Sequence, residues 1–224
     1  PGVRALNNAA ITVHEGEVMG LMGENGAGKS TLMNVLGGVF TADSGDIYIE
    51  GKMVSIHSVH DSQNMGVAFI HQELALEPYL TIAENIFLGR EMKNSLGMIS
   101  KDKMAEAAKP FLERVGLDID PNELVGRLSL GQQQMVEIAK SFSLNAKILI
   151  LDEPTDHLDM ESITALNNGM IKFPGVLLFS SRDHQIVQTT ANRIIEILPN
   201  GSMIDKITTY DEYLESDEMA RKRT

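Results

Sequence analysis

The chain of 224 residues contains no cysteine and no tryptophan. Without cysteine it forms no disulfide, no thiolate zinc site and no cysteine nucleophile, which fits a protein of a reducing compartment. No apolar run reaches the roughly 20 residues that a membrane-spanning helix needs, and the sequence does not open on a charged and then apolar signal segment. Since the first residue is Pro1 rather than Met, we expect a cut or processed N-terminus.

Basic residues are also scarce. The 19 Lys and Arg are outnumbered by 31 Asp and Glu, which gives a formal net charge of -12. Such a balance argues against a domain that binds nucleic acid mainly through the phosphate backbone, and we expect no nucleic-acid partner. With 43% apolar residues, the chain has enough material for the core of one domain.

Strand and helix patterns alternate in the first and last parts of the chain. A hairpin at 46–56, turning at Glu50-Gly51, predicts a separate antiparallel β subdomain. Alternation of strands and helices elsewhere predicts an α/β fold, with a mostly parallel core sheet that helices cover on both faces. Buried strands are expected at 18–22, 67–70, 148–151, 176–179 and 193–197, and a last short strand and the helix 210–215 follow Asn200-Gly201.

The middle of the chain reads as helical. We therefore predict one domain over residues 1–224, with a core lobe at about 1–71 and 147–224 and an inserted α-helical lobe at about 72–146. Three helices are expected in this lobe: one at 81–90, one from the N-cap Ser100 to Gly116 with Pro110 as a kink or break, and one from near Gly131.

A Gly-rich stretch between the first strand and the next helix matches the pattern G-x-x-x-x-G-K-[ST]. Its glycines let the backbone turn so that several N–H groups face one anion, and the helix adds its positive end. Lys29 is placed to reach the β- and γ-phosphates of a nucleotide, and the Ser30 hydroxyl to hold Mg²⁺. The residues predicted to bind ATP are Gly23, Glu24, Asn25, Gly26, Ala27, Gly28, Lys29, Ser30 and Thr31.

Two carboxylates, Asp152 and Glu153, follow the apolar run 148–151. A buried strand carries them to the edge of the sheet where ligands bind in such folds. Asp152 is expected to orient the metal, directly or through water, and Glu153 to hold and deprotonate the water that attacks the γ-phosphate. A strand that ends in solvated acids is common by itself, and it is the upstream Lys29 that favours the catalytic interpretation.

The segment Leu128 to Gln132, which reads LSLGQ, resembles the signature motif of ATP-binding cassette (ABC) ATPases, and the resemblance covers the whole chain. From the residues alone, Ser129 and Gly131 at a helix N-terminus form a second anion site. In the family this site closes on the γ-phosphate of ATP that a partner cassette holds, so the resemblance implies that two cassettes enclose two ATP molecules. The signature residues are Ser129, Leu130, Gly131 and Gln132.

The same resemblance implies further roles. Gln72 stands where the Q-loop glutamine of the family contacts Mg²⁺ and the attacking water, and Glu153 matches the catalytic glutamate. Residues 156–159 occupy the D-loop, with Asp159 as its last residue. The fold implied is that of a P-loop NTPase, and the cofactor is Mg²⁺, held by Ser30, Gln72 and Asp152.

Two branches of the family are represented. Residues 1–154 are similar to monosaccharide-importer ATPases, and residues 155–224 to the ABC-F group, paired cassettes that act on ribosomes. A join at 151–155 fits an engineered chimera, a mis-assembled sequence or a natural mosaic alike. The importer segments are 2–6, 22–30, 71–74, 83–90 and 132–140, and the ABC-F segments are 157–162, 191–196 and 210–214.

One position departs from the family pattern. A switch histidine is expected after the strand 176–179, but Arg182 stands there and His184 follows two residues later. Arg182 keeps a cation and hydrogen-bond donors for the γ-phosphate, yet it cannot shuttle a proton near neutral pH. We therefore expect hydrolysis that survives and is slowed. His184 is the alternative switch residue, although a helix that begins there would turn it to a different face.

The resemblance implies a nucleotide-binding domain that hydrolyses Mg-ATP as a dimer, drives membrane permease subunits and powers monosaccharide import. Its expected location is the cytoplasm, at the inner face of the cell membrane. Importers of this branch carry two cassettes in one chain, so we expect half of a longer protein, with an adenine-stacking aromatic residue just before Pro1. One alternative is an ABC-F ATPase on the ribosome, although no long charged helical linker is present. Another is a nucleotide-binding module that hardly turns over.

Overall fold

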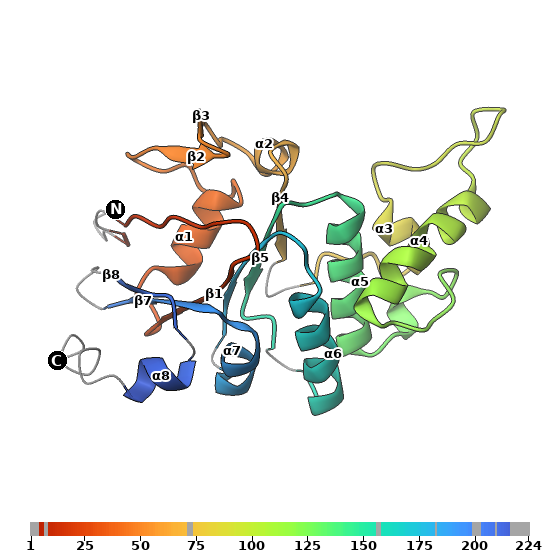
Figure 1. Cartoon of the computed structure of the whole chain (residues 1–224). Coiled ribbons are helices and arrows are strands. Elements are labelled where there is room, and N and C mark those ends of the chain that lie inside the picture. Colours follow the sequence, from red (N-terminus) through yellow and green to blue (C-terminus); the bar gives the residue numbers. More distant parts are fainter. Residues whose placement is uncertain are drawn as a thin grey trace.

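The computed structural model in Figure 1 describes residues 5–6, 9–70, 74–155, 158–181, 183–198, 203–208 and 210–215. A six-stranded sheet forms its centre, in the order β4-β5-β6-β1-β7-β8. The first five strands of this order pair in parallel, and β8 pairs antiparallel with β7, which confirms the predicted mostly parallel sheet. The strands are β1 (Val18–Gly23), β4 (Val67–Ile70), β5 (Ile148–Asp152), β6 (Val176–Ser180), β7 (Arg193–Ile197) and β8 (Met203–Lys206).

The parallel strands are apolar on both faces because helices cover both faces (Figure 1). In β5, Leu149 and Leu151 belong to one hydrophobic core, and Ile150 between them belongs to the other. Leu32 and Met33 of α1 complete the second core. The helices around the sheet are α1 (Lys29–Leu36) on one side and α5 (Leu130–Ser143), α6 (Met160–Ile171) and α7 (His184–Thr190) on the other.

Strands β2 (Ile47–Ile49) and β3 (Lys52–Val54) form a separate antiparallel hairpin, as predicted. Glu50 and Gly51 turn the chain with φ of 52° and 73°, the positive values that a two-residue hairpin turn needs. Helix α2 (Val59–Asn64), which follows, was not predicted. It is short and mostly polar, and it depends on a cap at Ser58 and on the buried Ser62 hydroxyl, which donates to Leu36 O at 2.9 Å.

The segment between β4 and β5 is helical, and the structure corrects one predicted helix end and one predicted helix break in it. Helix α3 (Ile82–Ile86) ends four residues before the predicted Arg90. The Arg90 guanidinium folds back onto the helix end and donates to Ile86 O at 2.8 Å, so it satisfies a terminal carbonyl. Helix α4 (Lys101–Val115) continues through the exposed Pro110, so of the predicted kink or break the break is wrong. The division into lobes at residues 72 and 146 stays a prediction.

The order of the strands gathers three chain segments at one edge of the sheet. Strands β5, β6 and β1 are neighbours that run in the same direction, so their carboxyl ends meet. Asp152 at the end of β5 lies beside Ser180 at the end of β6. Gly23 ends β1 on the other side of β6. The last helix, α8 (Tyr210–Glu215), packs against α7. Within the described residues, no helix combines the length and the apolar character needed to span a membrane.

Candidate functional site

The loop that joins β1 to α1 turns on glycines. Gly23, Gly26 and Gly28 have φ of 141°, 87° and 106°, which side-chain-bearing residues rarely adopt. Gly28 is the N-cap of α1 and provides no side-chain hydrogen bond, so no capping side chain covers the first N–H groups of the helix. The loop therefore leaves the positive end of α1 open to an anion, and the predicted binding of phosphate there stays a prediction.

Two of these glycines also permit close contacts. A Cβ atom on Gly28 would lie 2.6 Å from Ala5 O, and one on Gly23 would lie 2.5 Å from Ile197 O. A Cβ atom on Gly26 would meet nothing within 4 Å. The loop is thus fixed at its two ends by packing against the rest of the chain, while its middle faces open space.

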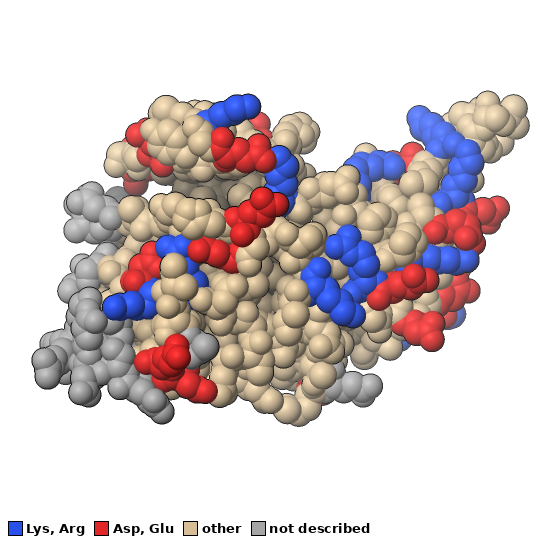
Figure 2. Space-filling view, in the orientation of Figure 1, with Lys and Arg blue, Asp and Glu red and all other residues tan. Residues whose placement is uncertain are grey.

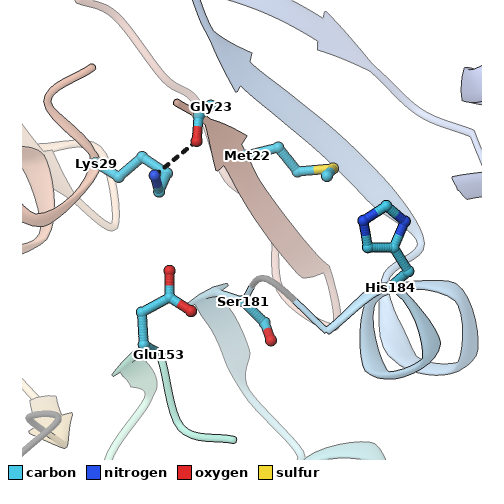
Figure 3. Close-up of a pocket in the computed structure, with 6 residues that line it drawn as sticks. All are labelled: Met22, Gly23, Lys29, Glu153, Ser181 and His184. Carbon is cyan, nitrogen blue, oxygen red and sulfur yellow. Dashed lines mark hydrogen bonds between the residues drawn. The ribbon is translucent and has the colours of Figure 1, made fainter. Parts of the chain in front are cut away.

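Lys29 lies at the centre of the site. Its Nζ donates to Gly23 O at 2.7 Å, the bond drawn in Figure 3, and to Glu24 O at 3.2 Å. It lines two adjoining cavities. One of about 190 Å³ is bounded by Met22, Gly23, Lys29, Glu153, Ser181 and His184, and one of about 410 Å³ by Asn25, Gly26, Gly28, Lys29, Ser30, Thr31 and Glu153.

The two carboxylates lie at this edge as expected. Ser180 Oγ donates to Asp152 Oδ1 at 2.8 Å and so orients that carboxylate. The Glu153 N–H donates to Ser180 O at 3.1 Å, and Glu153 has a φ of 48°. A left-handed backbone is uncommon for a residue other than glycine and is often found at functional sites. In Figure 3 the Glu153 side chain extends toward Lys29, and Glu153 borders both cavities.

The end of β6 adds Ser181, which the sequence did not single out, beside the predicted His184. Ser181 Oγ is 2.9 Å from Thr155 Oγ1 and accepts from the Asp183 N–H at 3.0 Å. A helix does begin at His184, yet His184 still borders the smaller cavity, at the opposite end from Glu153 (Figure 3). Its Nδ1 is 2.8 Å from the Tyr210 hydroxyl. The two serines that directly follow an apolar strand were the available signal for this part of the site.

Four predicted site positions lie outside the described residues, as does the predicted turn at Asn200-Gly201. The four site positions are Gln72 of the Q-loop, Asp156 and His157 of the D-loop, and Arg182 at the switch position.

The oxygen ligands present fit Mg²⁺. A hydroxyl at Ser30 and a carboxylate at Asp152 are the hard oxygen donors that this ion prefers. Within the part of the chain that the structure describes, no group of three or more His, Cys, Asp or Glu residues could hold a metal by itself. Magnesium typically takes one or two protein ligands and completes its shell with substrate phosphates and water, which suits so sparse a set.

The signature segment lies apart from both cavities. Ser129 is the N-cap of α5: its Oγ accepts from the Gln132 N–H at 3.3 Å, and Gln132 Oε1 accepts from the Ser129 N–H at 2.9 Å. Asp159 likewise caps α6. Ser129 and Leu130 are exposed, and no residue from Ser129 to Gln132 borders either cavity that Lys29 lines. Within one chain, the structure brings Lys29 and Glu153 together and leaves the signature outside.

Comparison with known proteins decides the family. The family model of the ABC transporter matches residues 6–156, more than half of the chain. The chain belongs to the ABC transporter family. It is an ATP-binding domain of that family. Ribose import ATP-binding proteins from two strains of Clostridium perfringens, 13 and SM101, are each 44% identical to it over 206 residues. The match takes in 90% of this ABC chain and 41% of each relative, so the chain spans about two fifths of the length of these relatives.

Solved structures show the same ABC fold. The ADP conformation of MJ1267, an ATP-binding cassette of an ABC transporter, has a TM-score of 0.80 at 24% identity, covering 97% of this chain and 91% of that one. The structure of cbiO1 from Clostridium perfringens has a TM-score of 0.76 at 22% identity, covering 97% and 87%. The dimeric post-hydrolysis state of the cassette MJ0796, bound to ADP and Pi, has a TM-score of 0.69 at 26% identity, covering 90% of each chain.

These comparisons bear on the expected join at residues 151–155. Residues 1–154 make up less than 90% of the chain, and 90% is the share that the match to the ribose import protein covers. This match therefore continues past the join. None of the relatives described above belongs to the ABC-F group. The similarity of residues 155–224 to that group stays a hypothesis without support from these comparisons.

Proposed function

We propose that this ABC domain binds Mg-ATP at the β1–α1 loop and hydrolyses it. The observation that carries the proposal is the convergence of Lys29 and Glu153 on the same cavities. Phosphoryl transfer to water requires a positive charge that stabilises the phosphate and a base that accepts the proton of the water. A cation and a carboxylate at the carboxyl edge of a parallel sheet supply these two groups.

The backbone N–H groups, Lys29 and Ser30 at the start of α1 each have a part in this proposed function. The uncapped N–H groups at the start of α1 hold phosphate oxygens, and Lys29 exchanges its bonds to Gly23 O and Glu24 O for bonds to the β- and γ-phosphates. Ser30 and Asp152 would hold Mg²⁺, together with Gln72 by the family pattern. The ion, when bound, supplies positive charge that stabilises the phosphates as the bond breaks.

Glu153 is the proposed general base. It holds the attacking water beside the γ-phosphate and takes its proton, while its unusual backbone conformation directs the side chain into the cavities. By the family pattern, Arg182 contacts the γ-phosphate and gives slower turnover than a histidine. His184 borders the smaller cavity and is the second candidate for that contact.

We propose further that the active unit is a pair of cassettes. The signature residues of one chain do not reach the cavities of the same chain, and Leu130 among them is 44% exposed. Placing them on the ATP of a partner cassette completes each site. The dimeric structure of MJ0796 with ADP and Pi supports the pairing of two cassettes. The second cassette is either another copy of this chain or a tandem copy in a longer protein.

The cargo proposed is a monosaccharide, because the ribose import ATP-binding proteins are 44% identical to this chain. In that role the domain works with permease subunits at the inner face of the cell membrane, and the helical lobe at about 72–146 docks on them. On the face in Figure 2, Lys and Arg are interspersed with Asp and Glu and form no broad basic area. Purification from the native cell checks this role, with permease subunits expected in the same fraction and ribosomes not.

The test of ATP binding and hydrolysis uses calorimetry with Mg-ATP and measurement of phosphate release. The wild-type chain is expected to bind and to turn over. Glu153→Gln is expected to keep its affinity and to lose about 100-fold to 10,000-fold in kcat, the range for removal of a general base. Glu113→Gln, an exposed change on α4, is the matched control and should behave as wild type. A wild-type chain that folds and takes up no Mg-ATP contradicts the proposal.

A further inference from the structure

Helix α8 reaches the phosphate site through the side chain of Tyr210. The Tyr210 hydroxyl is 2.8 Å from Nδ1 of His184 on α7, and the two rings meet edge to face, with centroids 5.3 Å apart and planes at 82°. The two residues are 26 positions apart in the sequence, so their pairing depends on the packing of α8 against α7. It connects α8 to a residue that borders the smaller cavity.

Burial fixes Tyr210 but not His184. Tyr210 is 3% exposed and belongs to the hydrophobic core, together with Ile186 and Val187 of α7. His184 is exposed, and it is the first residue of α7. An exposed histidine ring occupies several rotamers unless a partner selects one. The buried tyrosine is such a partner, because its hydroxyl bonds one ring nitrogen and its ring contacts that of His184.

The two nitrogens of the His184 ring face opposite ways. In Figure 3, one nitrogen lies on the side of Met22 and the cavity, and the other points away from them. The nitrogen that points away is next to the ring carbon that bears Cβ, which makes it Nδ1, the atom paired with Tyr210. Nε2 therefore faces the cavity that Lys29 and Glu153 also border.

The hydrogen bond at Nδ1 decides what Nε2 can do. In an imidazole ring, the partner of one nitrogen determines which of the two carries the hydrogen. When a phenolic hydroxyl donates to Nδ1, the ring hydrogen is on Nε2, and Nε2 becomes a donor. A donor suits a cavity in which Lys29 offers a cation to an anion. The opposite tautomer would direct a lone pair at the oxygens of that anion, which repel it.

We propose that Tyr210 is a positioning residue of the phosphate site. Its hydroxyl donates to Nδ1 of His184 and holds the ring so that Nε2–H faces the smaller cavity, where it donates to the terminal phosphate of bound ATP. Helix α8 thereby takes part in turnover as well as in packing. The inference rests on the proposed function, because the anion that His184 contacts is the terminal phosphate of ATP.

The first experiment removes the hydroxyl and keeps the ring. Tyr210→Phe preserves the core and the edge-to-face contact, but it frees the His184 ring to sample other rotamers. Three χ1 wells and two ring orientations leave the productive one about threefold to sixfold less populated. In the full chain we therefore expect kcat for Mg-ATP hydrolysis to fall by about this factor. The Kd for Mg-ADP by calorimetry should not change, because ADP lacks the terminal phosphate.

Tyr213→Phe is the matched control. Tyr213 is the second tyrosine of α8 and is buried as well, and its hydroxyl donates to Glu196 Oε2 on β7. It borders neither of the two cavities, so its kcat should equal that of wild type. If Tyr213→Phe loses as much turnover as Tyr210→Phe, or if the loss in Tyr210→Phe follows the fraction unfolded in urea, the proposal is overturned.

A double-variant cycle tests whether Tyr210 acts through His184. His184→Ala removes the donor and is expected to lower kcat by about tenfold, the effect of losing one hydrogen bond to a charged group. Adding Tyr210→Phe to this variant should lower kcat no further. A second loss of about threefold or more in that background would mean that Tyr210 acts by another route, which overturns the inference.

The position of the ring hydrogen is measured directly by NMR. Long-range correlation spectra distinguish the ring nitrogen that carries hydrogen, and the signals of His184 among the six histidines are those missing from His184→Ala. At a pH where the ring is neutral, we expect hydrogen on Nε2 in the wild type and a rise of the Nδ1–H form in Tyr210→Phe. Hydrogen on Nδ1 in the wild type, or the same tautomer ratio in both proteins, contradicts the proposal.

The proposed function and this inference fail separately. The NMR measurement needs no nucleotide and reports on the ring alone. Absence of Mg-ATP uptake by the wild-type chain removes the proposed function and, with it, the contact of His184 with a phosphate. Normal binding and hydrolysis by the wild type, beside an unchanged kcat in Tyr210→Phe, overturns this inference alone.

Discussion

Helices α1 and α5 both begin at a glycine-containing motif that the family assigns to ATP, yet their first turns are built in opposite ways. α1 starts after Gly28, which has no side chain to cap it. α5 starts after Ser129, which forms a reciprocal capping box with Gln132. The start of α1 thus leaves its N–H groups to a ligand, whereas the start of α5 is satisfied within the chain.

This difference separates a binding site from a contact surface. An uncapped helix start gains hydrogen bonds when an anion arrives, so the loop at Lys29 suits the proposed binding of phosphate within one chain. A helix start that is capped within the chain needs no anion to satisfy its N–H groups. The segment at Ser129 therefore keeps its shape before any partner cassette arrives. The Ser129 hydroxyl accepts from Gln132 N–H and retains its own hydrogen to donate. The two helix starts thus suit the two halves of one composite site.

The largest effect is expected at the uncapped helix. Lys29→Ala removes the cation that reaches the phosphates, and turnover should fall by about 100-fold or more, as for loss of a main stabilising donor. Calorimetry should show weaker Mg-ATP binding as well. Lys103→Ala is the control, because Lys103 also donates to a backbone carbonyl, Lys93 O at 3.2 Å, and lies outside both cavities. If Lys29→Ala binds Mg-ATP as tightly as wild type, the uncapped start of α1 does not bind phosphate in the way the comparison requires.

A smaller and more selective effect is expected at the capped helix. Ser129→Ala removes the cap, which costs about 1 kcal/mol of the free energy of unfolding. It also removes the donor offered to the partner's ATP, so kcat should fall about tenfold while the Kd for Mg-ATP stays the same.

Ser58→Ala is the matched variant, because Ser58 caps α2 through the Asp61 N–H in the same way. It should lose similar stability in urea and keep full turnover. Equal kcat in the two variants would mean that Ser129 serves the helix only.

The smallest effect tests capping where no nucleotide is involved. Helix α3 has a capping box of Thr81 and Glu84, and Lys101 pairs with Glu84 at 2.7 Å. The bond to Lys101, followed by that from the Thr81 N–H, lowers the pKa of Glu84 below its ordinary value. Because the folded-state pKa is the lower one, this stabilisation is complete above the unfolded-state pKa and disappears as the pH falls through the folded-state value.

Glu84→Gln should therefore reduce the free energy of unfolding at pH 7 by about 0.3 to 1 kcal/mol. The difference from wild type should vanish below the pKa of the folded state, and turnover at pH 7 should not change. Urea denaturation at a series of pH values measures this, with Glu106→Gln of the exposed pair with Lys109 as control. A difference that persists at low pH would show that shape rather than charge is responsible.

Sequence patterns predicted correctly those strands and helix caps that interactions between neighbouring residues determine. The apolar runs of β4 to β7 lie where they were expected, and Ser129 caps α5, because burial and capping are set by neighbouring residues. The meeting of Lys29 with Glu153 was also predictable, since parallel strands end at the same edge of a sheet.

What the sequence left open depends on packing between distant segments. Arg90 ends α3 by bonding Ser143, 53 residues away, which no helical pattern reveals. The contact of Gly131 with Ser162 and the bond of His184 to Tyr210 likewise need the arrangement of the helices. Sequence reasoning identified Gly131 as part of a motif, and only the structure shows which neighbour excludes a side chain there.

The bonds of Lys29 to Gly23 O and Glu24 O have a consequence for ligand choice. Its ammonium group is already neutralised in part by carbonyl dipoles of the loop, so any incoming anion competes with them for the same donors. In the proposed function, a triphosphate would reach both the lysine and the helix start, whereas a smaller anion would reach fewer of these donors. Under the proposed function, the lysine therefore favours a triphosphate over smaller anions.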